Sequence, residues 1–265
     1  MIKKIISGGQ TGADQAALDA AIKWNIPYGG WIAKGRLTET GRLADIYKMQ
    51  EMPTDSNAAR TEQNVIDSDG TLIISHGPLT GGSKYTHEMA LKHDRPHIHI
   101  NLNDTRAFDA ARQIYSWIIK AEIRTLNVAG PRASNDPYIY QSTMHILTTV
   151  LIMDFIETAM VGTQKTLPSE AITLTMAADN LISKMSLRER CFIANMPESE
   201  FIYLDLAIGN YIRKNFGLKS GHEALIKTCR NIMEKDDISD DEISQIIIKE
   251  LWKKLHKTHV LRIIN

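Results

Sequence analysis

The chain of 265 residues is 43% hydrophobic and 23% charged, a composition typical of a soluble globular protein with one or two domains. Lys and Arg together number 31, as do Asp and Glu, and this balance argues against nucleic acid or an anionic membrane as the partner. The chain begins directly with a strand and has two cysteines, Cys191 and Cys229. These features predict a cytoplasmic protein without a signal peptide, a disulfide framework or a zinc site.

Up to about residue 160, short β-rich runs alternate with helical stretches. The first run, Ile2–Ile6, precedes a helix whose small face carries Ala13, Ala17 and Ala20. Residues 29–60 are less regular and should add a further strand or a loop over a sheet edge. Strands then follow at 71–75, 97–101 and 126–129, and helices at 83–93, 106–123 and 137–159. This alternation predicts an α/β fold, with a parallel sheet covered by helices on both faces.

After Gly162 the strand signal ends and helix signals replace it. Three Ser-x-x-Glu patterns predict capping boxes at helix starts, namely Ser186 with Glu189, Ser220 with Glu223 and Ser239 with Glu242. Pro168 and Pro197 suit first helical positions, and Gly217 suits the end of a helix. The sequence therefore predicts two domains: a ligand-binding domain over residues 1–162, and a smaller all-α domain of about five helices over 166–265.

The predicted helix that begins near Pro137 is unusually apolar. It contains the run HILTTVLIMDFI, which is more apolar than one covered helix face requires. Part of this helix should therefore pack against the C-terminal domain or against another subunit. We expect a homodimer or a higher oligomer.

Three loops rich in glycine and small polar residues follow predicted strands. In a parallel α/β sheet such loops lie beyond the carboxyl ends of the strands, where ligands bind. The first, residues 7–12, places Thr11 and Asp14 at capping-box spacing, so that the acid should take the N–H groups that a phosphate needs. This loop better suits a neutral polar group such as a ribose or a base edge, with Gln10 as both donor and acceptor.

The second loop, residues 77–83, is the better phosphate site. Its helix has no acid in the first turn and places Lys84 there, a position that a bound phosphate would make favourable. From the third loop, residues 130–134, Arg132 could hold the same anion with two hydrogen bonds, and Ser134 lies beside it. The chain has neither a Walker pattern nor a complete G-x-G-x-x-G, so a P-loop enzyme or a standard dinucleotide dehydrogenase is not predicted.

Other polar groups allow two interpretations. Arg60, Thr61 and Asn64 share a helical face before a buried strand, and they serve either as a cap and salt bridge or as ligand contacts. His97 and His99 share a strand face, but a third ligand is missing from the pattern, and no protein-ligated metal is predicted. Acids of the irregular segment, such as Glu39, are interpreted as solvated.

Five motifs of this chain resemble those of the putative molybdenum carrier family, the circularly permuted YpsA-type branch of the SLOG superfamily. They cover about residues 1–160 and are SGGQTGADQAALDAA, GGW…KGR…E.G, RTEQNV.DSDGTLI, TGGSKYT.E.A and GPRAS. The resemblance implies a Rossmann-like sheet, an oligomer, and a pocket for a nucleotide-like or pterin-like phosphorylated ligand, such as molybdenum cofactor or a nucleotide. It implies a wall made by Gly8, Gly9, Gln10, Thr11 and Gly12, and a phosphate cradle made by Gly81, Gly82 and Ser83. The C-terminal part is similar to an uncharacterised helical domain.

The related LOG enzymes cleave the N-glycosidic bond of a nucleotide with a glutamate that follows a Gly-Gly-x-Gly-Thr motif. Here Gly81, Gly82 and Glu88 keep that spacing, but Lys84 and Tyr85 replace the Gly-Thr pair and Thr86 is displaced by one position. Glu88 is thus the candidate catalytic residue, and the resemblance leaves three functions open: a carrier, a nucleotide N-glycosidase, or a nucleotide sensor coupled to the helical domain. Our hypothesis is binding without efficient turnover.

Overall fold

The computed structural model describes residues 2–160 and 172–259. The chain folds as two compact units, residues 1–151 and 152–265, and the division falls inside helix α5 (Ile139–Met160). The boundary expected between residues 162 and 166 lies outside the described residues.

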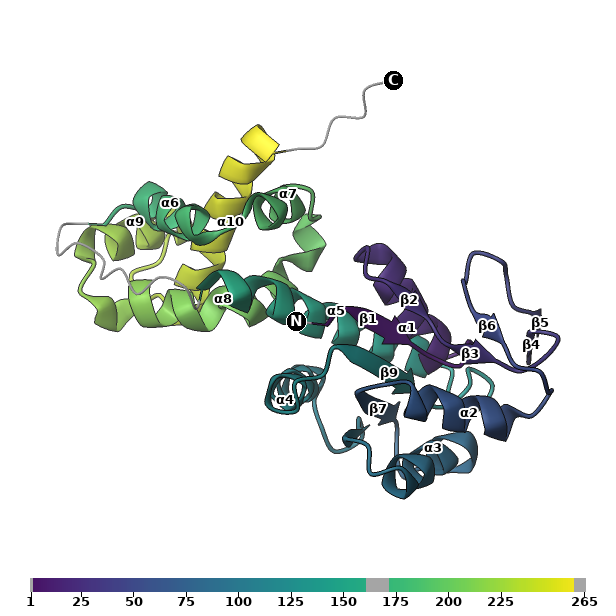
Figure 1. Ribbon diagram of the computed structural model, residues 1–265. Helices are drawn as coiled ribbons and strands as arrows, with labels where there is room; N and C mark the ends of the chain where they lie inside the picture. The colour runs from purple at the N-terminus through teal and green to yellow at the C-terminus, as the bar shows by residue number, and fades with distance from the viewer. Residues whose placement is uncertain (1, 161–171, 260–265) are drawn as a thin grey trace. The chain divides into compact units, whose positions relative to one another are not determined.

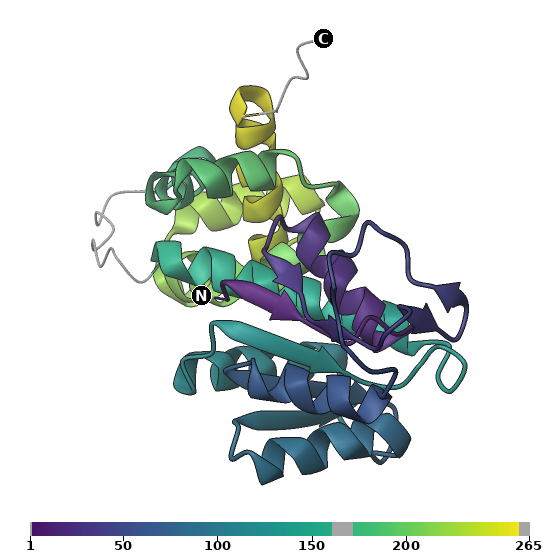
Figure 2. The same ribbon diagram turned by 45° about the vertical axis from the view of Figure 1, so that its right-hand side comes forward.

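The N-terminal unit is built on a five-stranded parallel sheet (Figures 1 and 2). Its strands, from one edge to the other, are β2 (Tyr28–Gly29), β1 (Lys4–Ile6), β9 (Thr125–Ala129), β7 (Gly70–Ser75) and β8 (His97–Asn101). Every residue of β7 is buried, as a parallel strand covered on both faces requires. The four strands expected from the sequence are confirmed, and the irregular segment supplies the edge strand β2.

Helices connect the strands and cover the sheet on both faces. They are α1 (Ala13–Lys23), α2 (Asn57–Ile66), α3 (Gly81–Lys92) and α4 (Ala107–Lys120), together with α5. Helices α2 and α3 pack side by side (Figure 1). Helix α1 leads from β1 to β2 at one edge of the sheet, and α3 leads from β7 to β8 at the other edge. Because such crossovers are right-handed, α1 and α3 lie on opposite faces of the sheet. The small face of α1 is fully buried at Ala13, Ala17 and Ala20, which lets this helix lie close to the sheet. The predicted Rossmann-like α/β fold is confirmed.

The segment between β2 and α2 forms two small ladders beside the main sheet. Strand β3 (Trp31–Ile32) pairs in parallel with β6 (Gln50–Glu51). Strands β4 (Leu37–Thr38) and β5 (Gly41–Arg42) form an antiparallel hairpin whose turn consists of Glu39 and Thr40. We call residues 37–42 the β4–β5 hairpin.

Most side chains of the apolar helix α5 are buried over residues 139–154, the part of the helix whose burial the structure describes. Its buried side chains include Ile146, Leu147, Val150, Leu151 and Ile152. The homo-oligomer expected from this helix stays a prediction.

The C-terminal unit consists, in its described residues, of helices packed around α10 (Asp240–His259). After the end of α5 come α6 (Leu174–Lys184), α7 (Leu187–Ala194), α8 (Phe201–Phe216) and α9 (Glu223–Met233), and these four helices contact α10. Residues Ile243, Ile247 and Leu251 of α10 are fully buried, and they form one face at i, i+4 and i+8 spacing. The predicted all-α character of this region is confirmed.

The predicted helix signals of this unit are correct in part. Capping boxes form at Ser186 and at Ser239, but the one predicted at Ser220 is wrong. The Ser220 hydroxyl donates to the Gly217 carbonyl in a 3₁₀ turn, and Gly221 then adopts a left-handed conformation. Helix α9 therefore begins two residues later than a Ser220 cap requires. Gly217 ends α8 as expected, Pro197 precedes a 3₁₀ turn, and Pro168 lies outside the described residues.

The capping box of α10 predicts an unusually acidic glutamate. Hydrogen bonds from the Lys235 ammonium, and from Ser239, lower the pKa of Glu242 to about 2. A carboxyl whose pKa is lower in the folded state stabilises the fold above its ordinary pKa, 4.5, and this contribution is lost as the pH falls through about 2. We expect a carbon-13 NMR titration to place the Glu242 pKa well below its ordinary value in wild type and nearer that value in Lys235→Ala. A Glu242 pKa that does not respond to this substitution would contradict the assignment.

None of the helices in residues 2–160 and 172–259 combines the length and the hydropathy needed to span a bilayer.

Candidate functional site

The three glycine-rich loops meet at one edge of the sheet because β1, β9 and β7 are neighbours. The loops after these strands surround a cavity of ≈390 Å³. Its lining also includes the start of α2. The predicted residues that line it are Gln10, Arg60, Gly81, Gly82, Ser83, Thr86, Arg132 and Ser134. Thr61, for which a ligand contact is one of the two interpretations, also lines the cavity. Lining residues outside the predicted set include Asp14, Asn57, Thr80, Tyr85 and Asn135.

The N-terminus of α3 opens on this cavity. Its N-cap residue, Thr80, has an extended backbone and makes no side-chain capping hydrogen bond, and the first turn holds no acid. The first N–H groups of a helix have no intrahelical acceptor, so those of Gly81, Gly82 and Ser83 are available to a ligand. Because the helix dipole places partial positive charge at this end, an anion is the favoured occupant.

Arg60 and Asp14 form a buried ion pair in the cavity wall. Arg60 Nη1 lies 3.5 Å from Asp14 Oδ2, and the two side chains are 12% and 7% exposed. Burial raises the pKa of Asp14, and the Arg60 charge acts in the opposite direction. The guanidinium lies directly against the first loop, since a Cβ added to Gly8 would overlap Arg60 Nη1. The geometry is compatible with both roles open to Arg60, a salt bridge and a ligand contact.

Arg132 supplies a second positive charge from the third loop. It is exposed, and its guanidinium makes no ion pair or hydrogen bond with any residue that the structure describes. Its charge lowers the pKa of Arg60, although burial is the larger cause. Two guanidinium groups and one carboxylate, Asp14, thus face the cavity, and an anion would relieve the repulsion between the two arginines.

The first loop contributes less to the cavity than expected. Gln10 is the one predicted residue of this loop that lines it. Gln10 Nε2 donates to the Leu37 carbonyl (3.1 Å) and Gln10 Oε1 accepts from the Glu39 N–H (3.3 Å), so its amide holds the β4–β5 hairpin. The remaining residues, Gly8, Gly9, Thr11 and Gly12, lie outside the cavity lining.

The capping box predicted for the first loop does not form. The N-cap of α1 is Gly12 and not Thr11, because Gly12 adopts a φ of 82° where the chain enters the helix. Asp14 Oδ2 accepts instead from the Gln10 N–H (3.3 Å) and faces Arg60. The acid does occupy a backbone donor of this loop, as expected, but its charge is balanced by an arginine that the local sequence pattern does not reveal.

Sequence reasoning missed Glu39, whose setting in an irregular polar segment indicates a solvated acid. Its carboxylate accepts hydrogen bonds from the Thr11 hydroxyl, the Ser134 N–H (3.1 Å) and the Ser134 hydroxyl. These bonds, led by the Ser134 hydroxyl, lower the Glu39 pKa. The β4–β5 hairpin is thereby joined to the first and third loops. The sequence feature that could have singled out Glu39 is its place in the motif KGR…E.G.

Asn64, Lys84 and Glu88 lie outside the cavity lining. Asn64 is buried and bonds to the backbone of Trp31 and Ser7, so it has the structural role, which is one of its two interpretations. Lys84 and Glu88 are 65% and 51% exposed and lie 3.9 Å apart on the outer side of α3. Thr86 lines the cavity while its hydroxyl donates to the Gly82 carbonyl (2.9 Å).

The histidines of β8 have separate partners. His99 Nε2 is 2.9 Å from the Ser75 hydroxyl, and the His97 ring packs against the edge of His87. Among the described residues there is no group of three or more His, Cys, Asp or Glu side chains arranged to hold a metal ion.

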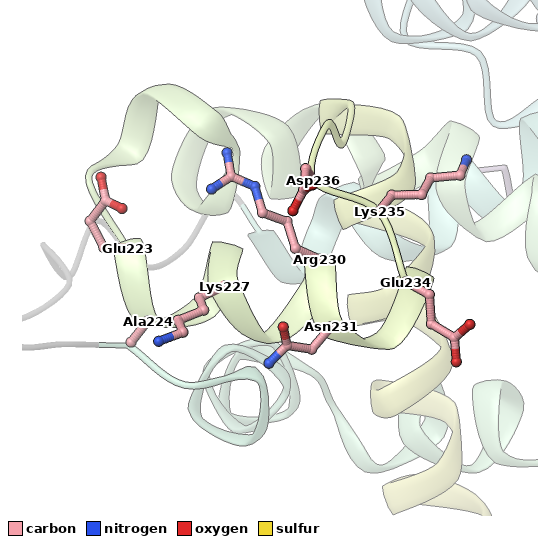
Figure 3. Close-up of a pocket in the computed structure, with 8 residues that line it drawn as sticks. All are labelled: Glu223, Ala224, Lys227, Arg230, Asn231, Glu234, Lys235 and Asp236. Atoms are coloured by element: carbon pink, nitrogen blue, oxygen red, sulfur yellow. The ribbon is translucent and has the colours of Figure 1, made fainter.

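A larger cavity, of ≈760 Å³, lies in the C-terminal unit (Figure 3). All its lining residues belong to α9 and the turn that follows it: Glu223, Ala224, Lys227, Arg230, Asn231, Glu234, Lys235 and Asp236. Its charges have both signs and come from one helix and the turn after it. The convergence of three loops and a helix N-terminus makes the cavity of the sheet edge the better candidate.

Together the fold and this cavity define a Rossmann-like ligand-binding protein. A family model described as the circularly permutated YpsA SLOG family matches residues 5–151, and the chain belongs to this family. The crystal structure of a putative molybdenum carrier protein from Syntrophus aciditrophicus SB is similar to this chain at 58% sequence identity with a TM-score of 0.56. The likeness covers 57% of this chain and 95% of that one.

A second family model, a domain of unknown function named DUF6794, matches residues 172–255. No curated protein matches the chain. The predicted resemblance to the molybdenum carrier family is thus confirmed over the N-terminal unit.

Proposed function

We propose that the N-terminal unit binds a phosphorylated small molecule, with the phosphate at the N-terminus of α3 between Arg60 and Arg132. The observation that carries this proposal is the uncapped first turn of α3, which faces a cavity with two arginines. Backbone N–H groups and guanidinium groups are the donors that proteins use most for phosphate. The surplus of one positive charge among the cavity's ionised side chains is consistent with an anionic ligand.

The organic part of the ligand is of the nucleotide or pterin class in this proposal. The rest of the lining carries no charged side chain and includes Asn57, Thr61 and Asn135, whose polar groups are able to hydrogen-bond a heterocycle or a sugar. The similar Syntrophus protein is named a putative molybdenum carrier, and we include molybdenum cofactor among the candidates for this chain. Mass spectrometry of ligand released from the purified protein would distinguish a pterin from a nucleotide.

The proposal is one of binding without turnover. A glycosidase requires its glutamate within hydrogen-bond reach of the ligand, but Glu88 lies on the outer side of α3 beside Lys84. Incubation with nucleoside monophosphates should therefore release no free base above background. Release that Glu88→Gln abolishes without weakening binding would assign catalysis to this residue.

Gly82→Asp should weaken binding of a phosphorylated ligand at least about tenfold, because it places a carboxylate among the donors of the helix N-terminus. A side chain fits there without displacing other atoms, since a Cβ added at Gly82 meets nothing within 4 Å. The fold should therefore survive. Isothermal titration calorimetry with inorganic phosphate and with a nucleoside monophosphate measures the loss.

Gln10→Ala is the comparison for this experiment. It removes a neutral lining group worth on the order of 1 kcal/mol, so its effect on binding should be smaller than that of Gly82→Asp. Equal losses in the two variants would contradict the placement of the phosphate at α3.

A further inference from the structure

The carboxylate of Glu39 is bound by the kind of donors that hold anionic ligands. Two hydroxyl groups, those of Thr11 and Ser134, and one backbone N–H, that of Ser134, converge on its two oxygens. Charge-assisted hydrogen bonds of this kind are stronger than neutral ones. In the structure this group of donors already holds an anion, which is a side chain of the same chain.

One of these two donor residues, Ser134, borders the cavity of the proposed function, and Thr11 lies outside its lining. Ser134 lines that cavity together with Arg132, and the Arg132 charge contributes to lowering the pKa of Glu39. Arg132 is therefore close enough to act on both the Glu39 carboxylate and the buried pair of Arg60 and Asp14. A ligand anion near Arg132 would lie in the same positive field as the Glu39 carboxylate.

Glu39 is also the movable part of this arrangement. It lies in the two-residue turn of the β4–β5 hairpin and is exposed, as are its neighbours Thr40 and Gly41. The base of the hairpin is held separately, since the Arg36 guanidinium donates to the Tyr47 carbonyl (2.9 Å). The Gln10 amide bonds backbone groups of the hairpin and not the Glu39 carboxylate. The side chain can therefore leave its donors by rotation about its own bonds.

We infer that Thr11, Ser134 and Arg132 form a second anion subsite, which the Glu39 carboxylate occupies until a ligand displaces it. The ligand class is then one with two anionic groups, such as a diphosphate: one group binds at the α3 N-terminus and the other replaces Glu39. This inference rests on the proposed function for the first of the two groups.

The test compares pyrophosphate with inorganic phosphate, titrated calorimetrically into wild type, Glu39→Ala and Glu39→Gln. In Glu39→Ala the affinity for pyrophosphate should rise about tenfold, because the ligand no longer has to displace a carboxylate from charge-assisted hydrogen bonds. The affinity for phosphate should change less. Glu39→Gln should give an intermediate rise, because a neutral amide still accepts from Ser134 but competes less well. Glu51→Ala is the matched control: it removes the same charge from exposed strand β6, and both affinities should stay unchanged.

Addition of Ser134→Ala to Glu39→Ala identifies the subsite. The double variant should lose most of the gain for pyrophosphate and keep its affinity for phosphate, which also shows that the protein is folded. If Glu39→Ala weakens both ligands, or leaves their ratio as in wild type, Glu39 is only a support for the hairpin and the inference is wrong while the phosphate site stands. If neither ligand binds wild type or any variant, both the inference and the proposed function fail.

Discussion

Arg60→Met should lower the free energy of unfolding by about 3–5 kcal/mol, because it leaves the Asp14 carboxylate buried without its charged partner. Methionine keeps much of the volume of the arginine side chain, so the loss of stability should come mainly from the lost charge and not from a cavity. The variant should also lose affinity for phosphate. Urea unfolding followed by circular dichroism measures the first effect, and calorimetry the second.

The double variant Arg60→Met/Asp14→Asn is the control for this prediction. It removes both charges and should recover most of the stability, but not the phosphate affinity. The pH dependence gives an independent check, since burial already raises the Asp14 pKa in wild type and loss of Arg60 raises it further. A carboxyl whose pKa is raised by folding favours the fold below its ordinary pKa and opposes it as the pH rises through the raised value. The deficit of Arg60→Met should therefore be smaller near about pH 4 than at about pH 7. A deficit independent of pH would contradict this explanation.

Gly12→Ala should prevent the first and third loops from meeting and lower the free energy of unfolding by about 3–5 kcal/mol. Gly12 has φ 82° and ψ −128°, a conformation open essentially to glycine. A Cβ there would overlap the Pro131 carbonyl oxygen and lie 2.9 Å from the Ala133 nitrogen. Both are backbone atoms, so no side-chain rotation relieves the contact. Strain and overlap therefore add, and urea unfolding measures their sum.

Gly82→Ala is the matched control for Gly12→Ala. It makes the same chemical change in the first turn of another helix, α3, where a Cβ meets nothing within 4 Å and the backbone is helical. Its stability should equal or slightly exceed that of wild type, because alanine restricts the unfolded chain more than glycine does. If both variants unfold at the same urea concentration as wild type, the close approach of Gly12 to the backbone of the third loop does not contribute to stability.

Features that depend on neighbouring residues could be predicted from the chain alone. The spacing of apolar residues along the chain predicts β7, β8 and α1. The Ser-x-x-Glu patterns at Ser186 and Ser239 predict the starts of two helices. The same local logic failed at Ser220, where the left-handed Gly221 delays the helix. The three loops were placed at one sheet edge because all parallel strands carry their carboxyl ends there.

Which of these residues face the same cavity depends instead on how the whole unit packs. The insertion of β9 between β1 and β7 brings Arg132 close to Asp14 and Arg60, and no local pattern encodes the order of strands. The same packing lets Glu39 bind Ser134, a contact that spans 95 positions in the chain. Lys84 and Glu88 follow the phosphate loop in sequence but lie outside the cavity lining. They lie on the outer side of α3, whereas Ser83 and Thr86 of the same helix line the cavity. Successive residues of a helix point in directions about 100° apart, so neighbours in sequence can face different surroundings. Long-range packing, in contrast, brings together residues that no sequence pattern connects.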